Sequence, residues 1–391
     1  MVLFSSMVRK KTIWNLLQTC FVIIAGIIIV AITGCENLKG NIAGIDKFTE
    51  SYKFSIFEWE TENLFSTNNR PADIATVQRY FSIASEVNSA ATPDPAIETG
   101  LKQIEPSVEA AITNQIQAVL IDQRIMPSND YFNFNVPPVY FRLTRAPYIL
   151  ATSPRSAISL QNQVLLKNDV TEQEIDTIEK QVGGLNLSVI TEELGGYGAI
   201  YPTCVADNAT LEYTIETAAH EWAHQYLAFK PLGFRYILDG LGIKKDYDAV
   251  IINETIADII GKEIASDIIK QYYPAVEAGQ TTTLPGNGFD FNQEMRDIRR
   301  QVDSLLSAGK IDEAESYMNT MQQFLMTKGY YIRKLNQAYF AFHGIYADSP
   351  VSIDPLGGQL HQLRAESRSL KDFLDRVDNI VSRQEVIDSL K

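Results

Sequence analysis

Two of the chain's four histidines, His220 and His224, stand four residues apart and enclose a glutamate, in a run that favours a helix. Residues four apart lie one above the other on a helix, so both imidazoles can bind a single ion. Glu221 lies about 100° round that helix from His220, which lets its carboxylate reach a water molecule beside the ion without binding the ion. The neighbours Ala218 and Trp222 are uncharged, as expected for a helix buried at the base of a cleft.

A second group of polar residues follows on another expected helix, where the run from Asn253 to Asp258 reads NETIAD. Twenty-nine residues separate His224 from Glu254. Asp258 lies one turn beyond Glu254 on the same helix face, and a histidine that binds a metal usually donates its other ring N–H to a carboxylate. The run IINETIADII is otherwise almost wholly apolar, so both carboxylates are expected to point into the protein.

The combination of HExxH followed by NExxxD is similar to that of the gluzincin metallopeptidases, the clan that includes thermolysin. The resemblance implies a zincin-like fold and a Zn²⁺ ion bound by His220, His224 and Glu254. It implies that Glu221 is the general base for hydrolysis of a peptide bond by an activated water, without a covalent intermediate. Three protein ligands leave one position of a tetrahedral zinc open, as a catalytic site requires.

The resemblance also assigns residues around the metal ligands. It implies that Asp258 orients His220 and that Asn253 lies beside the ligands. It covers roughly residues 186 to 270. The interval between the two motifs is longer than in thermolysin-like enzymes, so residues 231–248 are expected to form a different loop. A hydrolase of another amide or ester, and a non-catalytic envelope lipoprotein that uses the same domain for binding, are the alternative functions.

The run GAIYPT before the first motif resembles the edge strand that pairs with the extended substrate backbone in this clan. We therefore expect Ala199 to Tyr201 to bind a peptide or protein substrate through main-chain hydrogen bonds. Gly195, Gly196 and Gly198 indicate either a backbone that another group approaches closely or a bulge.

Gluzincins also need a hydrogen-bond donor that faces the oxyanion, usually histidine or tyrosine. The C-terminal run LNQAYFAFHGIYA and the sequence after it offer several such side chains. His343 is the first choice for this catalytic role. The other candidates are Tyr339, Tyr346 and His361.

The N-terminus carries a membrane-targeting pattern. No charged residue occurs from Thr12 to Gly34, and Arg9, Lys10 and Lys11 precede this segment. The positive flank should stay in the cytoplasm, which places the rest of the chain outside the membrane of a bacterial cell envelope. The sequence ITGC that ends at Cys35 resembles a lipobox, which predicts a lipidated cysteine. An uncleaved single-pass anchor is the alternative.

The remaining sequence predicts an α+β protein. Residues 36–130 are expected to be helical, residues 131–275 to form the catalytic core with a small mixed sheet and the active-site helices, and residues 276–391 to be mainly helical. The net charge of −14 argues against a nucleic-acid partner, because binding to phosphates needs a basic surface. With three cysteines no disulfide framework is expected, and Cys204 is predicted to be a small buried apolar residue.

Overall fold

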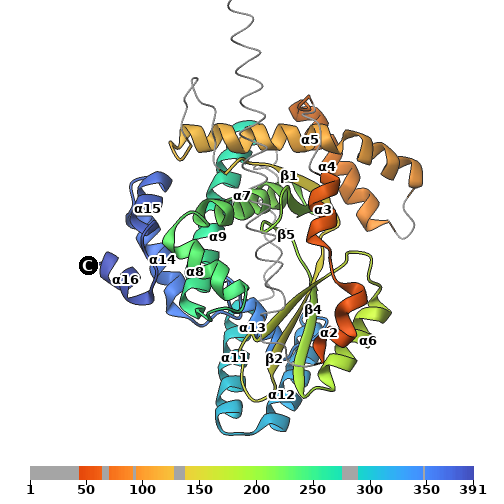
Figure 1. The fold of residues 1–391 in the computed structure, drawn as a ribbon, viewed down its shortest axis with the longest axis vertical. Coiled ribbons are helices and arrows are strands. Elements are labelled where there is room, and N and C mark those ends of the chain that lie inside the picture. The colour runs from red at the N-terminus through yellow and green to blue at the C-terminus, as the bar shows by residue number, and fades with distance from the viewer. Residues whose placement is uncertain (1–43, 64–69, 91–93, 127–136, 275–288, 347) are drawn as a thin grey trace, which may run out of the picture.

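The computed structural model describes residues 44–63, 70–90, 94–126, 137–274, 289–346 and 348–391. Figure 1 shows a mixed structure of many helices and two small sheets, which confirms the predicted α+β class. The targeting segment and Cys35 lie outside the described residues. None of the helices described is both long enough and apolar enough to cross a bilayer.

One sheet is mixed and has the strand order β1-β6-β5. Its strands are β1 (Phe141–Thr144), β5 (Gly196–Tyr197) and β6 (Thr203–Ala206). Strand β6 runs parallel to β1 and antiparallel to β5. Cys204 on β6 is buried, as predicted.

The prediction of a strand over the GAIYPT run is wrong for most of its length. Residues 198–202 form the loop between β5 and β6, and the strand begins only at Thr203. Glycine and proline at the two ends of this segment favour a turn over a continuous strand.

The second sheet is antiparallel and has the order β3-β2-β4. Its strands are β2 (Tyr148–Pro154), β3 (Asn162–Leu166) and β4 (Leu187–Glu193). Alternate residues of a strand point to opposite faces, so Leu150 packs against helix α6 (Glu172–Gly183). Its neighbour Ile149 packs against helix α13 (Gln337–His343) on the other face. The sheet is thus covered by helices on both sides.

The N-terminal part is helical, as predicted. Its elements are α2 (Ile45–Thr49), a 3₁₀ turn (Glu50–Tyr52), α3 (Ile56–Asn63), α4 (Ile74–Ser89) and α5 (Pro95–Asp122). Proline favours the first turn of a helix, and from the sequence Pro71 is a candidate for that position, but α4 begins three residues later at Ile74. The reason is the side chain of Asp73, which accepts a hydrogen bond from the Thr76 backbone N–H (2.8 Å) and caps the helix there.

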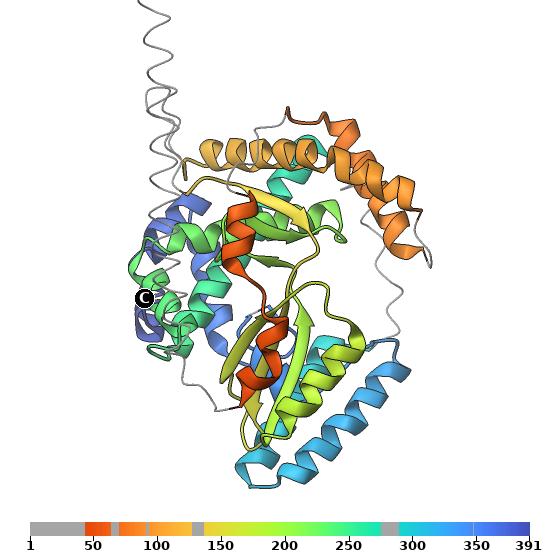
Figure 2. The ribbon, with the colours of Figure 1, turned by 45° about the vertical axis from the view of Figure 1, so that its right-hand side comes forward.

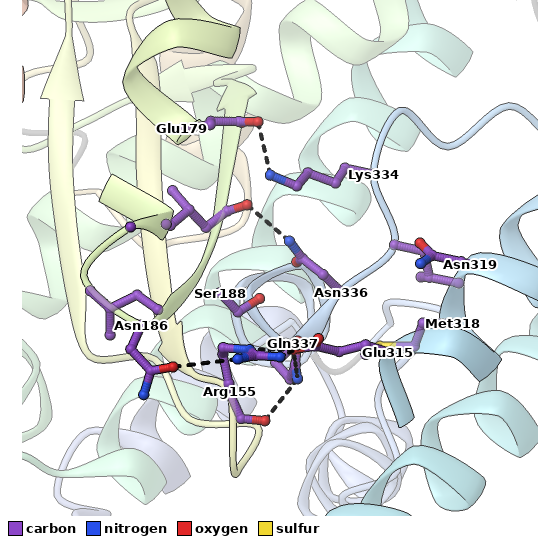
Figure 3. Close-up of a pocket in the computed structure, with 15 residues that line it drawn as sticks. Arg155, Glu179, Asn186, Ser188, Glu315, Met318, Asn319, Lys334, Asn336 and Gln337 are labelled. Atoms are coloured by element: carbon purple, nitrogen blue, oxygen red, sulfur yellow. Dashed lines mark hydrogen bonds and ion pairs between the residues drawn. The ribbon is translucent and has the colours of Figure 1, made fainter. Parts of the chain in front are cut away.

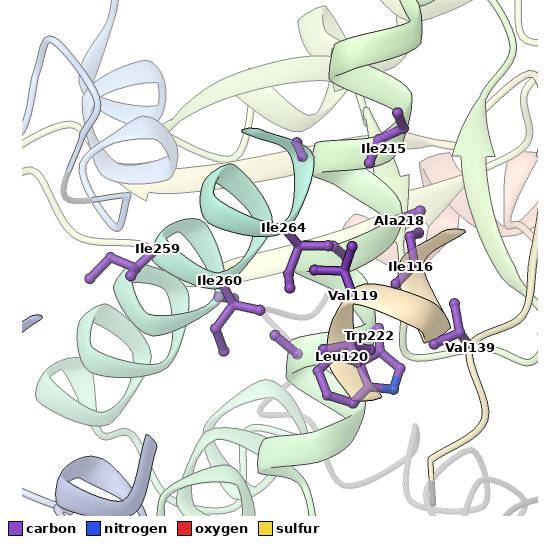
Figure 4. Close-up of a cluster of buried hydrophobic side chains, with 14 of the residues drawn as sticks. Ile116, Val119, Leu120, Val139, Ile215, Ala218, Trp222, Ile259, Ile260 and Ile264 are labelled. Carbon is purple, nitrogen blue, oxygen red and sulfur yellow. The ribbon is translucent and has the colours of Figure 1, made fainter. Parts of the chain in front are cut away.

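Two long helices in the middle of the chain, α7 (Leu211–Leu227) and α9 (Tyr247–Tyr272), pack closely together. Figure 4 shows Trp222 of α7 in the apolar cluster that these helices form with α5. The indole N–H of Trp222 donates to the carbonyl of Pro137 (3.0 Å), which satisfies its one polar atom. This core fixes the relative positions of the two helices that carry the sequence motifs.

The segment that joins α7 to α9 is mostly helical rather than a loop. Helix α8 (Pro231–Gly240) begins with proline in its first turn, where the missing N–H of proline has no hydrogen bond to lose. The expectation of a loop over residues 231–248 is therefore wrong for its first ten residues.

The C-terminal part is helical, as predicted, with α11 (Phe291–Ser307), α12 (Ile311–Thr327), α14 (Pro355–Glu366), α15 (Leu370–Val377) and α16 (Arg383–Ser389) in addition to α13. Figures 1 and 2 show the hairpin of α11 and α12 at the end of the molecule opposite α5.

The apolar spacing of the sequence favours one helix from Tyr330 to Tyr346, but helix α13 is shorter than that. The Asn336 side chain accepts from the backbone N–H of Tyr339 (2.8 Å), so the helix begins only after Asn336. Before it, the chain has no regular secondary structure, and the side-chain amide of Gln322 donates to the carbonyls of residues 332 and 333.

Candidate metal centre

Helix α7 places two imidazoles beside each other, as the spacing predicts. The side chain of Thr210 caps the helix, and its hydroxyl accepts from the Tyr213 N–H at 3.3 Å. Three turns further on, the Nε2 atoms of His220 and His224 lie 3.0 Å apart. Each of the two side chains is only 13% exposed. Both imidazoles therefore direct their Nε2 atoms toward one point.

Glu254 of α9 completes the cluster. Its Oε2 atom lies 3.5 Å from Nε2 of His220 and 3.4 Å from Nε2 of His224. This oxygen is buried and forms no hydrogen bond within the described part of the chain. A buried carboxylate oxygen without a partner is costly unless a cation or a donor faces it. One atom from each of the three side chains lies within 4.8 Å of the others, so the three residues are positioned to bind a metal ion.

The charge of Glu254 suits a metal ligand. Burial favours its protonated form, but the adjacent His224 and His220 hold the pKa of Glu254 well below its ordinary range. The residue is therefore a carboxylate, which is the form that binds metals.

The imidazoles are oriented by polar partners on the side away from the cluster. Nδ1 of His220 lies 2.9 Å from the carboxylate of Asp258. Nδ1 of His224 lies 2.6 Å from the side-chain oxygen of Asn253. An acceptor at Nδ1 fixes the tautomer that leaves Nε2 free to bind an ion. The structure thus brings together the residues that the two motifs single out.

Tyr236 is a part of the site that the sequence reasoning missed. It belongs to α8, and its hydroxyl donates to Oε1 of Glu254 at 2.7 Å. Its ring stacks on the ring of His224, with centroids 5.2 Å apart and planes 7° from parallel. Tyr236 therefore contacts two metal-binding residues at once. The helical spacing of Leu232 and Tyr236 behind Pro231 is the signal that could have placed this tyrosine on an inward-facing helix.

Glu221 points to the loop between β5 and β6. Its Oε2 accepts a hydrogen bond of 2.7 Å from the backbone N–H of Gly198. A Cβ atom on Gly198 would lie 2.6 Å from that oxygen, and one on Gly196 would lie 2.5 Å from a methyl carbon of Thr217. The glycines therefore reflect a close approach, and the approaching side chains come from α7.

The candidates for an oxyanion donor lie in different surroundings. His343 ends α13 with its ring against Tyr339 and Phe342, and burial lowers its pKa to about 4. His361 pairs with Asp348 at 2.7 Å and is 43% exposed. No described contact joins either histidine to the metal-binding residues.

Tyr346 is the candidate whose pKa responds to the charges of the cluster. Burial and the negative charges of Glu254 and Glu221 raise the pKa of Tyr346 well above its ordinary value. The hydroxyl therefore stays protonated and can donate a hydrogen bond near the metal-binding residues.

A cavity of about 470 Å³ lies between β4, α12 and the start of α13, and none of the metal-binding residues lines it (Figure 3). Its charged side chains are paired with each other. Arg155 binds Glu315 at 2.7 Å, and Lys334 binds Glu179 at 3.1 Å. This cavity is therefore held by internal ion pairs and offers no free charge to a ligand.

Comparison of the chain with protein-family models, with curated proteins and with solved structures gave no match.

Proposed function

We propose that this protein is a zinc-dependent peptidase that hydrolyses peptide bonds with Glu221 as the general base. The proposal is supported above all by the convergence of two imidazoles and one carboxylate on one point, with a carboxylate oxygen of Glu254 that has no hydrogen-bond partner among the described residues. A glutamate one residue after the first histidine accompanies this cluster. Two motifs far apart in the sequence thus contribute to a single site.

The choice of zinc follows from the donor set. Two histidine nitrogens and one carboxylate oxygen are a common ligand set of catalytic zinc, which keeps a further position for water or substrate. When bound, zinc would supply a Lewis acid that polarises the scissile carbonyl and lowers the pKa of a water molecule.

The side chains of this chain would handle the proton and the developing charge. Glu221 would take the proton of the attacking water and pass it to the leaving amine. Its Oε2 is held by the Gly198 N–H, so the carboxylate keeps a fixed direction. The Tyr346 hydroxyl, kept protonated by its surroundings, replaces His343 as our preferred donor to the oxyanion.

The substrate side of the proposal rests on the sequence. A peptide or protein is the proposed substrate, and the N-terminal segment with Cys35 would tether the enzyme to the outer side of a bacterial cytoplasmic membrane. A zinc hydrolase of another amide or ester would use the same residues. A non-catalytic lipoprotein is disfavoured, because the proposed base and all three proposed ligands are present.

The proposal is tested with purified wild type and Glu221→Gln. We expect one zinc per chain in both proteins, measured by atomic emission, because Glu221 is not a ligand. Cleavage of a quenched fluorescent peptide library should fall roughly 10²- to 10⁴-fold in Glu221→Gln, since the proton acceptor is lost. Wild type that binds no zinc would refute the metal site. Zinc binding without cleavage of any peptide would refute the peptidase and leave the other hydrolases.

A further inference from the structure

Gly198 is bound at both of its backbone polar groups by one face of helix α7. Its N–H donates to Oε2 of Glu221 at 2.7 Å. Its carbonyl accepts from the side-chain amide of Gln225 at 3.0 Å. The same amide nitrogen of Gln225 donates to the Thr203 hydroxyl at 3.0 Å, where strand β6 begins. Glu221 and Gln225 are four residues apart and therefore lie one above the other on the helix.

The far end of the loop is held by helix α3. The indole N–H of Trp59 donates to the carbonyl of Pro202 at 2.9 Å. The ring of Tyr201 packs against that of Tyr140, with centroids 5.7 Å apart. The loop from Gly198 to Pro202 is thus bound by two helices, α7 and α3. Among the described residues, the hydrogen bond that joins this loop to the proposed base is the one from the Gly198 N–H.

We propose that Gln225 is a positioning residue that acts on Glu221 through Gly198. This inference rests on the proposed role of Glu221 as the general base. The amide of Gln225 fixes the Gly198 carbonyl, and the Gly198 N–H in turn holds Oε2 of Glu221. Oε1 is then the carboxylate oxygen left to receive a proton. Without the Gln225 amide, the Glu221 carboxylate would still be present on α7, but its orientation would no longer be fixed.

The physical reason lies in the freedom of glycine. Gly198 has no side chain, because a Cβ atom there would collide with Glu221, and a residue without Cβ has the widest choice of backbone angles. Hydrogen bonds from outside the loop must therefore supply the restraint that a side chain would give elsewhere. A misplacement of about 1 Å in a catalytic group can lower turnover about 100-fold.

The test compares Gln225→Met with Gln322→Met. Methionine keeps the length of the side chain and removes the amide. Gln322 is a matched control, because its amide also ties a helix to a neighbouring segment, donating to two carbonyls at 2.8 Å in a part of the protein away from the metal-binding residues. Thr203→Val is a second variant, which removes the other acceptor of the Gln225 amide and keeps the side-chain shape.

Three quantities are measured for each full-length protein: bound zinc, the kinetics of cleavage of one fluorogenic peptide that wild type cleaves, and the deuterium exchange of residues 194–203. For Gln225→Met we expect unchanged zinc, faster exchange of this segment, and a kcat lowered roughly 10- to 100-fold with KM changed less than about twofold. Thr203→Val should also show faster exchange and a lower kcat, but both changes should be smaller than in Gln225→Met. Gln322→Met should match wild type.

Faster exchange with an unchanged kcat would show that Gln225 only stabilises the loop, and this result would overturn the proposal. Equal exchange in Gln225→Met and wild type would overturn the claim that Gln225 restrains Gly198. If Gln225→Met does not fold, the deuterium exchange and the kcat of Thr203→Val are compared with those of wild type instead, and the same two outcomes would overturn the proposal. Absence of any cleavage by wild type would refute the peptidase function, whereas the exchange comparison would still report on the restraint of Gly198.

Discussion

Each of the three side chains that are positioned to bind a metal ion is held by a polar partner on the side away from the cluster. The pairs are His220 with Asp258, His224 with Asn253, and Glu254 with Tyr236. Such partners restrict the rotation of the ligands, so less freedom is lost when an ion binds. The site is therefore organised by the protein itself, and each partner is expected to influence the affinity for the ion.

At this scale we predict that Tyr236→Phe weakens zinc binding about 10- to 100-fold. The variant keeps the ring that stacks on His224 and loses the hydroxyl that holds Glu254. Competition with a chromogenic chelator measures the affinity. Tyr331→Phe, at a tyrosine that is 78% exposed, is the control and should bind zinc like wild type. Equal affinity in both variants would contradict a role for the Tyr236 hydroxyl.

We also predict that Tyr346→Phe lowers kcat roughly 10²-fold with little change in KM, because a donor to the oxyanion acts mainly in the transition state. Steady-state kinetics on a peptide substrate provide the test. His343→Ala is measured in parallel. A large fall in kcat for His343→Ala with none for Tyr346→Phe would return the role to His343.

The site residues that could be predicted from the sequence are those that follow the period of a helix. The spacing of His220 and His224 requires only that the segment be helical, and Asp258 follows from the same rule applied to Glu254. The spacing of Tyr236 from Leu232 could place it on an inward-facing helix, but no spacing rule ties it to either motif, so its contact with Glu254 could not be predicted. The preference for His343 over Tyr346 rested on residue type, and only the fold separates their surroundings.

At the scale of elements, the close contact between α7 and α9 depends on a glycine in the middle of α9. A Cβ atom on Gly261 would lie 2.8 Å from the carbonyl oxygen of Glu216 and 3.1 Å from Cβ of His220. The two helices carry all three metal-binding residues. The helix spacing at this point therefore sets the geometry of the cluster.

We predict that Gly261→Ala destabilises the protein by about 1–3 kcal/mol, since the backbone of α7 must move to accept the methyl group. It should also lower the affinity for zinc. Gly100→Ala in α5 is the matched control. A Cβ atom there meets no other atom within 4 Å, so the variant should gain up to about 1 kcal/mol from helix propensity. Urea unfolding measures both. A stabilised Gly261→Ala would refute the close contact.

The elements themselves were predicted unevenly. The two motifs were predicted to lie on helices, and α7 and α9 are long helices with capped first turns, so that prediction is confirmed. Helix α8 was predicted as part of a loop, because the interval between the two motifs is longer than in thermolysin-like enzymes and the extra length was assigned to a loop. The GAIYPT run has the composition of a strand, yet the hydrogen bonds of Gly198 go to side chains of α7 rather than to a neighbouring strand.

At the scale of the whole molecule, the proposed ion would join two helices of the main apolar core. Both α7 and α9 contribute to the cluster that includes Trp222, Ile260 and α5 (Figure 4). An ion that binds only the folded chain stabilises it in proportion to the logarithm of its concentration over Kd. Metal binding and global stability are therefore expected to be coupled.

We predict that removal of zinc lowers the unfolding temperature of wild type. At a free zinc concentration of about 1,000 times Kd the ion adds about 4 kcal/mol to the free energy of unfolding. Differential scanning calorimetry with and without chelator measures the shift, and added zinc should reverse it. Glu254→Gln lacks a ligand and should respond much less. An equal response of the two proteins would contradict the role of Glu254.

The arrangement of the whole molecule was the least predictable from the sequence. The α+β class followed from the order of periodic segments, but the division of the strands into two sheets depends on pairings between distant segments, such as β1 with β6. The helical region of residues 36–130 carries no motif that points to a function, and its contact with the site is visible only in the fold, where Trp59 of α3 binds the loop that reaches Glu221.

Because α8 is a helix, the effect of changing the number of residues between the two motifs depends on where the change is made. A residue inserted between Pro231 and Tyr236 would rotate the tyrosine by about 100° about the helix axis, away from Glu254. An insertion in the turn at residues 241–246 would leave the phase of α8 unchanged. Tyr236 therefore depends on helical phase, whereas the total number of residues between His224 and Glu254 can vary at that turn.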